Sequence, residues 1–211
     1  MSIFSVQGII EAFQSCYGFF ASFLGYGLGL IAFSLFVSTL LLPLGKWAIN
    51  QSKKEKEIEA ILSPKIKQLK AECKGATLSN EIAKLYQKYS YNPIYSIRLS
   101  LPAFTQLPVL FLAFFALFDY APLKGQSFLI IDDLSVPDTF LFGYALLPFV
   151  MTAINCITVY ISPFSKKEQM VCYLLAFLFL LLLYIAPAAL LIYWTSNNTY
   201  NLVKTIVRNR G

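Results

Sequence analysis

Long apolar segments separated by short polar ones make up most of the chain. A helix needs about 20 mostly apolar residues to cross a bilayer core of about 30 Å. Five segments meet that requirement: residues 26–45, 99–118, 140–161, 169–186 and 187–207. Backbone polar groups inside lipid must pair within their own segment, so each segment is predicted to be helical. The pattern predicts an all-α membrane protein, one domain with a bundle of five transmembrane helices.

The last two predicted spans nearly touch at residues 184–187. One continuous helix over both would be far longer than a bilayer is thick. Pro187 lacks the N–H that a helix interior needs. We expect a tight turn between two helices, and a single bent helix is the alternative.

Residues 1–25 show a different pattern, in which apolar side chains recur every three or four positions. These are Ile3, Val6, Ile10, Phe13, Tyr17, Phe20 and Leu24. Glu11 and Gln14 fall on the opposite side, which is typical of an amphipathic helix lying in the headgroup region. A sixth transmembrane helix is the alternative, although it would bring both polar residues into hydrocarbon. No basic n-region precedes the apolar residues, so a cleavable signal peptide is not expected.

Residues 46–98 form the one long polar stretch. Two runs of apolar residues with helical spacing lie in it, one from Ile58 to Cys73 and one from Leu78 to Tyr89, with Gly75 between them. Glycine commonly ends a helix, so two short amphipathic helices are predicted to fold back on each other as a hairpin. Pro64 is expected to kink the first helix or restart it.

The distribution of charge predicts the orientation. Basic residues gather in residues 46–98 and 162–168 and after residue 203, whereas residues 119–139 contain one lysine and four aspartates. Cytoplasmic loops of membrane proteins are enriched in Lys and Arg. We therefore expect the N-terminus outside and the C-terminus in the cytoplasm. The same distribution accounts for the net charge of +6, so no nucleic-acid partner is required.

The amino-acid composition limits which catalytic and metal-binding functions the chain can have. The chain is 57% hydrophobic and 13% charged, against about 25% charged residues in soluble domains. It has no histidine, and its four cysteines are far apart in the sequence. No catalytic or metal-binding constellation is recognisable, so the sequence predicts no enzyme activity and no cofactor.

Charged residues are rare inside the predicted spans, which leaves neutral polar side chains as the candidates for function. They gather in the fifth span at residues 195–199, with further examples at Ser34, Ser38 and Gln106. Amides left bare in lipid cost several kcal/mol, so one face of these helices should line a hydrated cavity or a polar interface. The alternative is hydrogen bonding between helices.

Local motifs, in this order, resemble the YidC-type membrane protein insertase family over essentially the whole chain. They are Leu41-Leu42-Pro43-Leu44, Ser63-Pro64-Lys65-Ile66, Asn92-Pro93, Pro102 with Gln106 and Pro108, and Leu191-Ile192-Tyr193-Trp194-Thr195-Ser196-Asn197. The resemblance implies a hydrophilic groove, open to the cytoplasm and to lipid, that helps short membrane proteins enter the bilayer of the bacterial inner membrane without nucleotide hydrolysis. Two features depart from the family pattern: Ser38 stands where the family usually has an arginine, and residues 94–98 replace a Gly-rich stretch.

On this resemblance, six residues are expected to line the groove and contact substrate: Ser34, Ser38, Gln106, Trp194, Ser196 and Asn197. Five lysines of the hairpin are expected to contact a cytoplasmic partner: Lys53, Lys54, Lys65, Lys67 and Lys70. The implied partners are the lipid bilayer, nascent or small membrane proteins, and a ribosome or translocon. The alternative function is a structural or assembly subunit bound permanently to another membrane enzyme or export complex.

Overall fold

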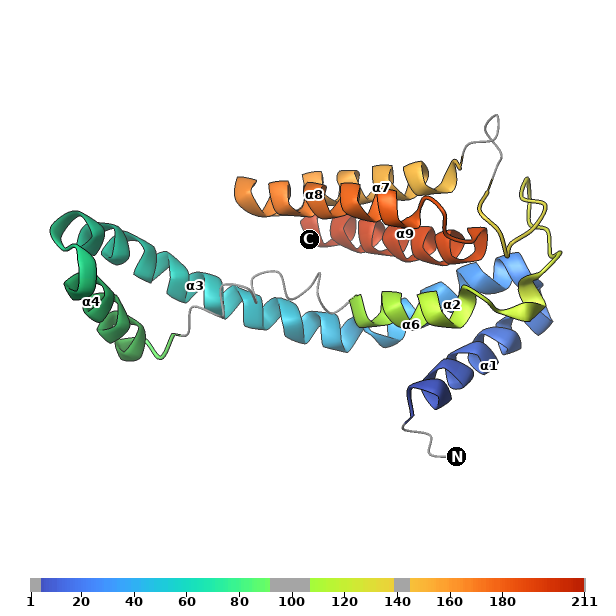
Figure 1. Ribbon diagram of the computed structural model, residues 1–211, viewed down its shortest axis with the longest axis horizontal. Coiled ribbons are helices and arrows are strands. Elements are labelled where there is room, and N and C mark those ends of the chain that lie inside the picture. The colour runs from blue at the N-terminus through green and yellow to red at the C-terminus, as the bar shows by residue number, and fades with distance from the viewer. Residues whose placement is uncertain (1–4, 92–106, 139–144, 211) are drawn as a thin grey trace. The chain divides into compact units, whose positions relative to one another are not determined.

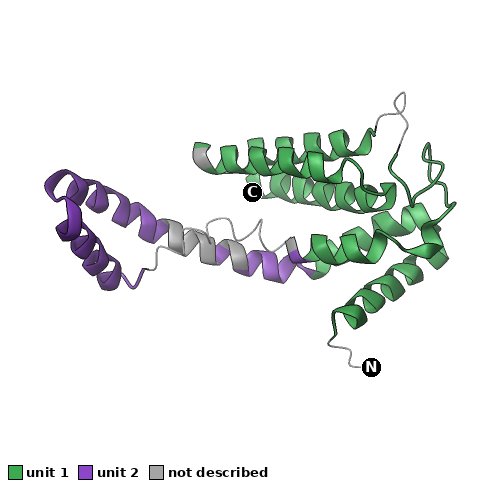
Figure 2. Ribbon diagram, viewed as in Figure 1, with its two compact units in different colours: residues 1–40, 109–211 green, residues 41–108 purple. Residues whose placement is uncertain are grey.

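The computed structural model describes residues 5–91, 107–138 and 145–210. The chain divides into two compact units, which Figure 2 shows in different colours. Met1–Leu40 and Val109–Gly211 form the first, called here the bundle unit, and Leu41–Pro108 form the second, called the hairpin unit. Each unit is described by itself below.

The bundle unit consists of helices, with a long connection between α6 and α7 (Figure 1). Its elements are α1 (Val6–Leu24), α2 (Tyr26–Leu40), α6 (Leu107–Leu117), the 3-10 helix η2 (Ala121–Leu123), α7 (Leu147–Ile161), α8 (Lys166–Leu183) and α9 (Ala188–Arg210). Helix α9 packs against both α2 and α7, while α1 packs on α2 and α8 on α7. Within the described ranges, the prediction of an all-α protein is confirmed.

The turn predicted at residues 184–187 is also confirmed. Helix α8 ends at Leu183 and α9 begins at Ala188, with the N–H of Ala186 donating to the Leu183 carbonyl at 3.1 Å. The alternative of one long bent helix is therefore wrong. At its other end, α8 begins with a capping box in which Ser165 and Glu168 each accept a hydrogen bond from the other's backbone N–H, an arrangement that pairs donors a helix start leaves free.

Among the described residues, no helix combines the length with the apolar character that a membrane crossing requires.

The α1–α2 packing depends on a very close approach of the two backbones. A Cβ atom on Gly29 would lie 2.9 Å from the Cα of Ala21, which is shorter than a van der Waals contact. Aromatic rings fill the space beside this contact, with the centroids of Phe13 and Phe33 4.7 Å apart and that of Tyr193 within 6.0 Å of both. Glycine at this position is therefore required by helix packing.

The amphipathic pattern of α1 agrees with the side chains that it buries. Phe13, Tyr17 and Ala21 are buried on one face, and Glu11 is exposed. Gln14 is half-buried, and its Nε2 donates to the Ala116 carbonyl of α6 at 2.8 Å. The amphipathic face is thus used for packing within the bundle unit, while a position of α1 in the headgroup region stays a prediction.

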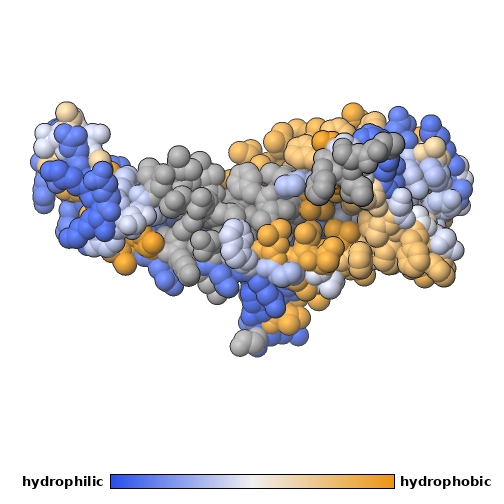
Figure 3. Space-filling model, turned by 90° about the horizontal axis from the view of Figure 1, so that it is seen from below, coloured by the Kyte–Doolittle hydropathy of each residue, from blue (hydrophilic) through white to orange (hydrophobic). Residues whose placement is uncertain are grey.

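The outward surface of the bundle unit is unusually apolar. On α8, large apolar side chains are exposed at Met170, Val171, Leu174, Phe177, Leu178, Leu181 and Leu182. Figure 3 shows hydrophobic patches over the helices of this unit, whereas the hairpin is mostly hydrophilic. Soluble monomers rarely expose contiguous apolar surface of this extent, which marks contact with lipid or protein.

The hairpin unit contains α3 (Leu42–Glu72) and α4 (Gly75–Lys88), which pack against each other. Gly75 has φ +64°, a conformation that glycine adopts without strain. Helix α3 begins before the expected boundary at residue 46 and continues through Pro64. The restart expected at Pro64 is therefore wrong. Pro64 removes the donor to the carbonyl of Ala60, and both residues are exposed, so water can bond to that carbonyl.

Candidate functional site

A polar seam runs between α2 and α9 in the bundle unit. The Ser34 hydroxyl donates to the backbone carbonyl of Tyr193 at 2.8 Å, and Ser34 has no exposed surface. Four residues further along α2, the Ser38 hydroxyl donates to the Ser34 carbonyl at 2.7 Å and is 8% exposed. Both hydroxyls are satisfied, as buried polar groups must be.

The seam becomes more exposed toward the C-terminal ends of the two helices. Thr39 of α2 is exposed; its hydroxyl donates to the Leu35 carbonyl of its own helix at 2.8 Å and lies 3.4 Å from the Tyr200 hydroxyl of α9. Ser196 is half-buried and donates to the Ile192 carbonyl of its own helix at 2.8 Å. The pairs Ser34–Tyr193 and Thr39–Tyr200 show that α2 and α9 run parallel.

Helix α9 also carries buried polar atoms that have no hydrogen-bond partner among the described residues. These are Tyr193 Oη, Trp194 Nε1, Thr195 Oγ1 and Asn198 Nδ2. The Trp194 ring lies 6.0 Å from that of Phe179 in α8, so it points to a different side of α9 than the seam. An unpaired buried polar group costs about 1–3 kcal/mol, which makes this stretch of α9 suited to meeting a polar chain segment or ordered water.

The structure brings together most of the predicted groove residues. Ser34, Ser38 and Ser196 lie along α2 and α9, and Asn197 is 4% exposed and accepts at Oδ1 from Asn201 Nδ2 at 2.8 Å. Gln106 lies outside the described residues. The carbonyl of Tyr193, which completes the seam, was missed because a backbone acceptor leaves no signal in the sequence.

The predicted contact lysines do not share one face of the hairpin. Lys65 Nζ donates to the hydroxyl of Tyr89, the residue that follows α4, and lies 4.7 Å from the centre of its ring. That hydrogen bond lowers the pKa of the Tyr89 hydroxyl below its ordinary value. Lys65 is therefore engaged inside the hairpin. Lys53 and Lys54 lie on α3, but their side chains are outside the description.

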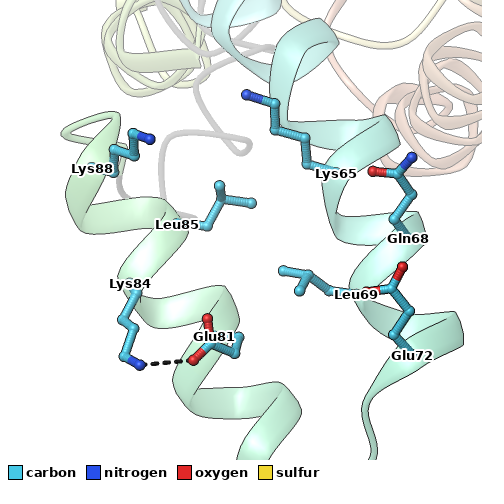
Figure 4. A pocket seen from close by; sticks show the side chains of 8 residues that line it. All are labelled: Lys65, Gln68, Leu69, Glu72, Glu81, Lys84, Leu85 and Lys88. Atoms are coloured by element: carbon cyan, nitrogen blue, oxygen red, sulfur yellow. Dashed lines mark hydrogen bonds and ion pairs between the residues drawn. The ribbon is translucent and has the colours of Figure 1, made fainter.

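Two shallow crevices lie between α3 and α4. One, of about 310 Å³, is lined by Lys65, Gln68, Leu69, Glu72, Glu81, Lys84, Leu85 and Lys88. In Figure 4, Leu69 and Leu85 point toward each other, and Lys84 pairs with Glu81 at 2.7 Å. The other, of about 330 Å³, is lined by Glu59, Leu62, Ser63, Ile66, Lys67, Lys70, Tyr86 and Tyr91. Lys67 and Lys70 are exposed beside the second crevice, so they remain available to a partner.

Metal chemistry finds no support in the described ranges. No group of three His, Cys, Asp or Glu side chains comes together there. The cysteines at positions 16, 73, 156 and 172 are unpaired thiols, each half-buried.

Comparison with known protein families identifies the family that has this arrangement. The family model described as "60Kd inner membrane protein" matches residues 18–211, which include all the groove and hairpin residues discussed above. The chain belongs to this family.

Relatives in the 60Kd inner membrane protein family carry the name membrane protein insertase YidC. One from Helicobacter pylori is 29% identical over 213 residues, 98% of this chain and 36% of the relative. One from Treponema denticola is 30% identical over 208 residues, 88% of this chain and 34% of the relative. One from Streptococcus agalactiae, named YidC 1, is 27% identical over 194 residues, 87% of this chain and 67% of the relative. The chain spans about a third of the first two relatives.

A solved structure shares the fold. It is described as an active YidC insertase crystal structure with the first transmembrane domain resolved, and it matches with a TM-score of 0.60 at 21% identity. The match covers 94% of this chain and 46% of the other. The chain therefore shares the fold of that structure over most of its length.

Proposed function

We propose that the chain is a membrane protein insertase, or membrane chaperone, of the bacterial inner membrane that helps short membrane proteins enter the bilayer. The observation that carries this proposal is the family match over residues 18–211, with relatives named as insertases. The polar seam between α2 and α9 supports it, since it lies within a unit whose outer surface is apolar.

The proposed mechanism uses hydrogen bonding and hydrophobic transfer. A polar stretch of substrate meets the neutral polar groups of Ser34, Ser38, Ser196 and Asn197, which reduces the cost of taking its polar groups out of water. The apolar part of the substrate then slides along the exposed apolar surface into lipid. Its transfer releases about 25 cal/mol per Å² of apolar surface, so no nucleotide hydrolysis and no catalytic group are needed.

The proposed topology has five spans, with the N-terminus outside and the hairpin and C-terminus in the cytoplasm. The distribution of Lys and Arg along the chain supports it. In this orientation the seam opens toward the cytoplasm, the side from which a newly made protein arrives. Lys53, Lys54, Lys67 and Lys70 are then placed to contact a ribosome, a translocon or anionic headgroups.

A reconstituted assay tests the function. The purified chain is placed in lipid vesicles with a short single-span protein that has a polar tail, and protease protection of the tail is measured. We expect the chain to raise the protected fraction. A protected fraction equal to that of empty vesicles would contradict the proposal.

A substitution in the seam tests whether the seam itself contributes to insertion. Asn197→Leu should slow insertion about threefold, because a hydrogen bond between membrane segments is worth about 0.6 kcal/mol. Asn155→Leu is the matched control, since Asn155 is a half-buried asparagine of α7 outside the seam. Equal slowing by both variants would show that the seam has no special role.

Purification of the native complex from its own membranes distinguishes an insertase from the remaining alternative, a dedicated subunit of another complex. A spread of short membrane proteins, with or without ribosomal proteins, supports an insertase. One partner at fixed stoichiometry and no other client would instead make the chain a dedicated subunit.

A further inference from the structure

A tight turn in residues 119–138, the connection that follows α6 (Figure 1), has two large apolar side chains at its tip. Phe128 and Ile131 exchange backbone hydrogen bonds at 2.8 and 3.0 Å, so Leu129 and Ile130 are the two central residues of the turn. These two residues are called here the tip. Leu129 is 87% exposed and Ile130 is 57% exposed. Among the described residues, Leu129 is the most exposed of the large apolar side chains.

The backbone at the tip is unusual for leucine. Leu129 has φ +54°, in the left-handed region that glycine and asparagine adopt readily and leucine rarely does. Two-residue hairpin turns ordinarily have glycine or asparagine in such a position. An exposed leucine here is unfavourable in water for two reasons, its backbone conformation and its apolar surface. Both reasons indicate that water is not the medium around this side chain.

The rest of the connection is fixed, so the tip has a defined position. The Val136 carbonyl accepts from the N–H of Ala188, at the start of α9, at 2.8 Å. Asp138 Oδ2 accepts from the N–H of Leu147, at the start of α7, at 3.0 Å. Leu134 has no exposed surface. The tip therefore projects from a folded base.

The ring at the base of the turn lies on the start of α2. A Cβ atom on Gly27 would be only 2.0 Å from the Phe128 ring. Gly27 is the second residue of α2, where the first predicted membrane span begins. The apolar side chains of Phe23 and Leu28, before and after it in the chain, are exposed. The apolar surface of the bundle unit therefore extends to the helix end on which the turn is held.

Tyrosines gather at the same helix end. The Tyr120 ring lies 5.8 Å from that of Tyr17 in α1, and the Tyr17 hydroxyl donates to the carbonyl of Tyr26, the first residue of α2, at 3.0 Å. Tyrosine is enriched where a membrane meets water, because its ring is apolar and its hydroxyl is polar. Under the proposed topology, the start of α2 and the turn beside it lie at the level of the lipid headgroups.

Charge and size favour lipid over protein as the partner of the tip. The four residues of the turn carry no charge, and the exposed carboxylate of Asp132 follows them. That carboxylate has to stay in water, so only the two tip side chains can be immersed. Two side chains are far less than the surface of about 800 Å² that each partner contributes to a specific protein interface. The tip therefore fits shallow insertion into a bilayer.

We propose that Leu129 and Ile130 are a lipid anchor, which enters the bilayer surface beside the start of α2 and holds residues 119–138 at the membrane. Lipid provides an apolar environment for both side chains, and this offsets the unfavourable backbone conformation of Leu129. The anchor rests on the span proposed to begin at Tyr26, and not on the insertion of substrates.

Collisions of a spin label with two relaxing agents test the anchor. In a variant whose four native cysteines are replaced by serine, Leu129→Cys carries a nitroxide, and the full chain is placed in nanodiscs of phosphatidylethanolamine and phosphatidylglycerol without substrate. Oxygen concentrates in lipid, whereas a water-soluble nickel chelate stays in water. Because apolar groups at a bilayer surface lie about 5–10 Å deep, the oxygen-to-nickel collision ratio at Leu129→Cys should be about tenfold that at Asp132→Cys.

A second variant tests whether the leucine side chain itself is needed and preserves the turn. Asparagine adopts a left-handed backbone readily, so Leu129→Asn keeps the turn and removes the apolar side chain. With the label at Ile130→Cys, adding Leu129→Asn should lower the collision ratio to the value at Asp132→Cys. An unchanged ratio would mean that the folded base alone sets the position of the tip, and it would overturn the anchor.

The remaining outcomes are also decisive. Equal ratios at Leu129→Cys and Asp132→Cys would place the tip in water and overturn the proposal. Dipolar broadening between labels, lost on dilution with unlabelled chain, would place a second copy on the tip and overturn it as well. Since no substrate is present, a chain that is inactive in the vesicle assay would contradict the proposed function and leave the anchor standing.

Discussion

Different interactions stabilise the interior of each of the two units of the chain. Aromatic rings, the contacts of Gly29 with the Ala21 backbone and of Gly27 with the Phe128 ring, and the hydrogen-bonded start of α9 stabilise the bundle unit. Among the described residues of the hairpin unit, the buried apolar side chains are Leu62 and Tyr91. Local opening requires least free energy where few apolar contacts are buried. The hairpin is therefore the easier unit to open.

The largest expected effect comes from removing the hairpin's main buried side chain. Leu62 is 1% exposed, and Leu→Ala at buried sites costs about 2–5 kcal/mol. Leu62→Ala should therefore abolish hydrogen-exchange protection in α3 and α4 while that of the bundle unit persists. Ile61→Ala is the control, since Ile61 is 47% exposed. Equal loss of protection in both units would show that they do not open separately.

Alanine substitutions at two glycines, one in each unit, should change stability by smaller amounts and in opposite directions. Gly29→Ala forces a Cβ atom against Ala21 and should lower the free energy of unfolding by about 1–3 kcal/mol, as overpacking does. Gly45 lies in α3 with nothing within 4 Å of the added atom. Gly45→Ala should raise stability by about 0.5–1 kcal/mol through helix propensity. Thermal unfolding in detergent measures both, and changes of the same sign would refute the packing account.

The smallest effect concerns Tyr89. Its pKa is lowered because Lys65 donates a hydrogen bond to its oxygen. A lowered folded-state pKa adds stability above the unfolded-state pKa, and this addition is lost as the pH falls through the folded value. Lys65→Met should raise the pKa of Tyr89 and remove the gain at alkaline pH. Ultraviolet titration of tyrosinate measures it, with Tyr89→Phe identifying the signal. An unchanged titration in Lys65→Met would contradict the pairing.

Helices and turns, which depend on local residue patterns, could be predicted from the sequence. Helical spacing predicted the α3–α4 hairpin, Gly75 its turn, and Pro187 the break between α8 and α9. Pro64 did not restart α3, since the carbonyl that it leaves without a donor belongs to Ala60, which is exposed, and exposure cannot be read from the sequence. A kink at Pro64 stays a prediction. The match to residues 18–211 confirmed the family that the motifs indicated.

Contacts between residues far apart in the chain could not be predicted from the sequence. Asp138 was interpretable only as one of four acidic residues on the outer side, since its partners are backbone groups of α7. The contact of Phe128 with Gly27 joins residues about a hundred positions apart, and no local pattern in the sequence pairs them. The roles of the predicted groove residues likewise remain proposals, although most of those residues lie on two adjacent helices.

The Ser34–Tyr193 hydrogen bond has a consequence for how firmly α2 and α9 are joined. In the buried part of the seam, Ser38 bonds within its own helix, so the described bond that crosses from α2 to α9 is the one from Ser34. A hydrogen bond between membrane helices is worth about 0.6 kcal/mol on average, close to the thermal energy at room temperature. Under the proposed function, a substrate carbonyl accepts from Ser34 in place of Tyr193 at little net cost in free energy, so binding at this point is brief and independent of the substrate's sequence.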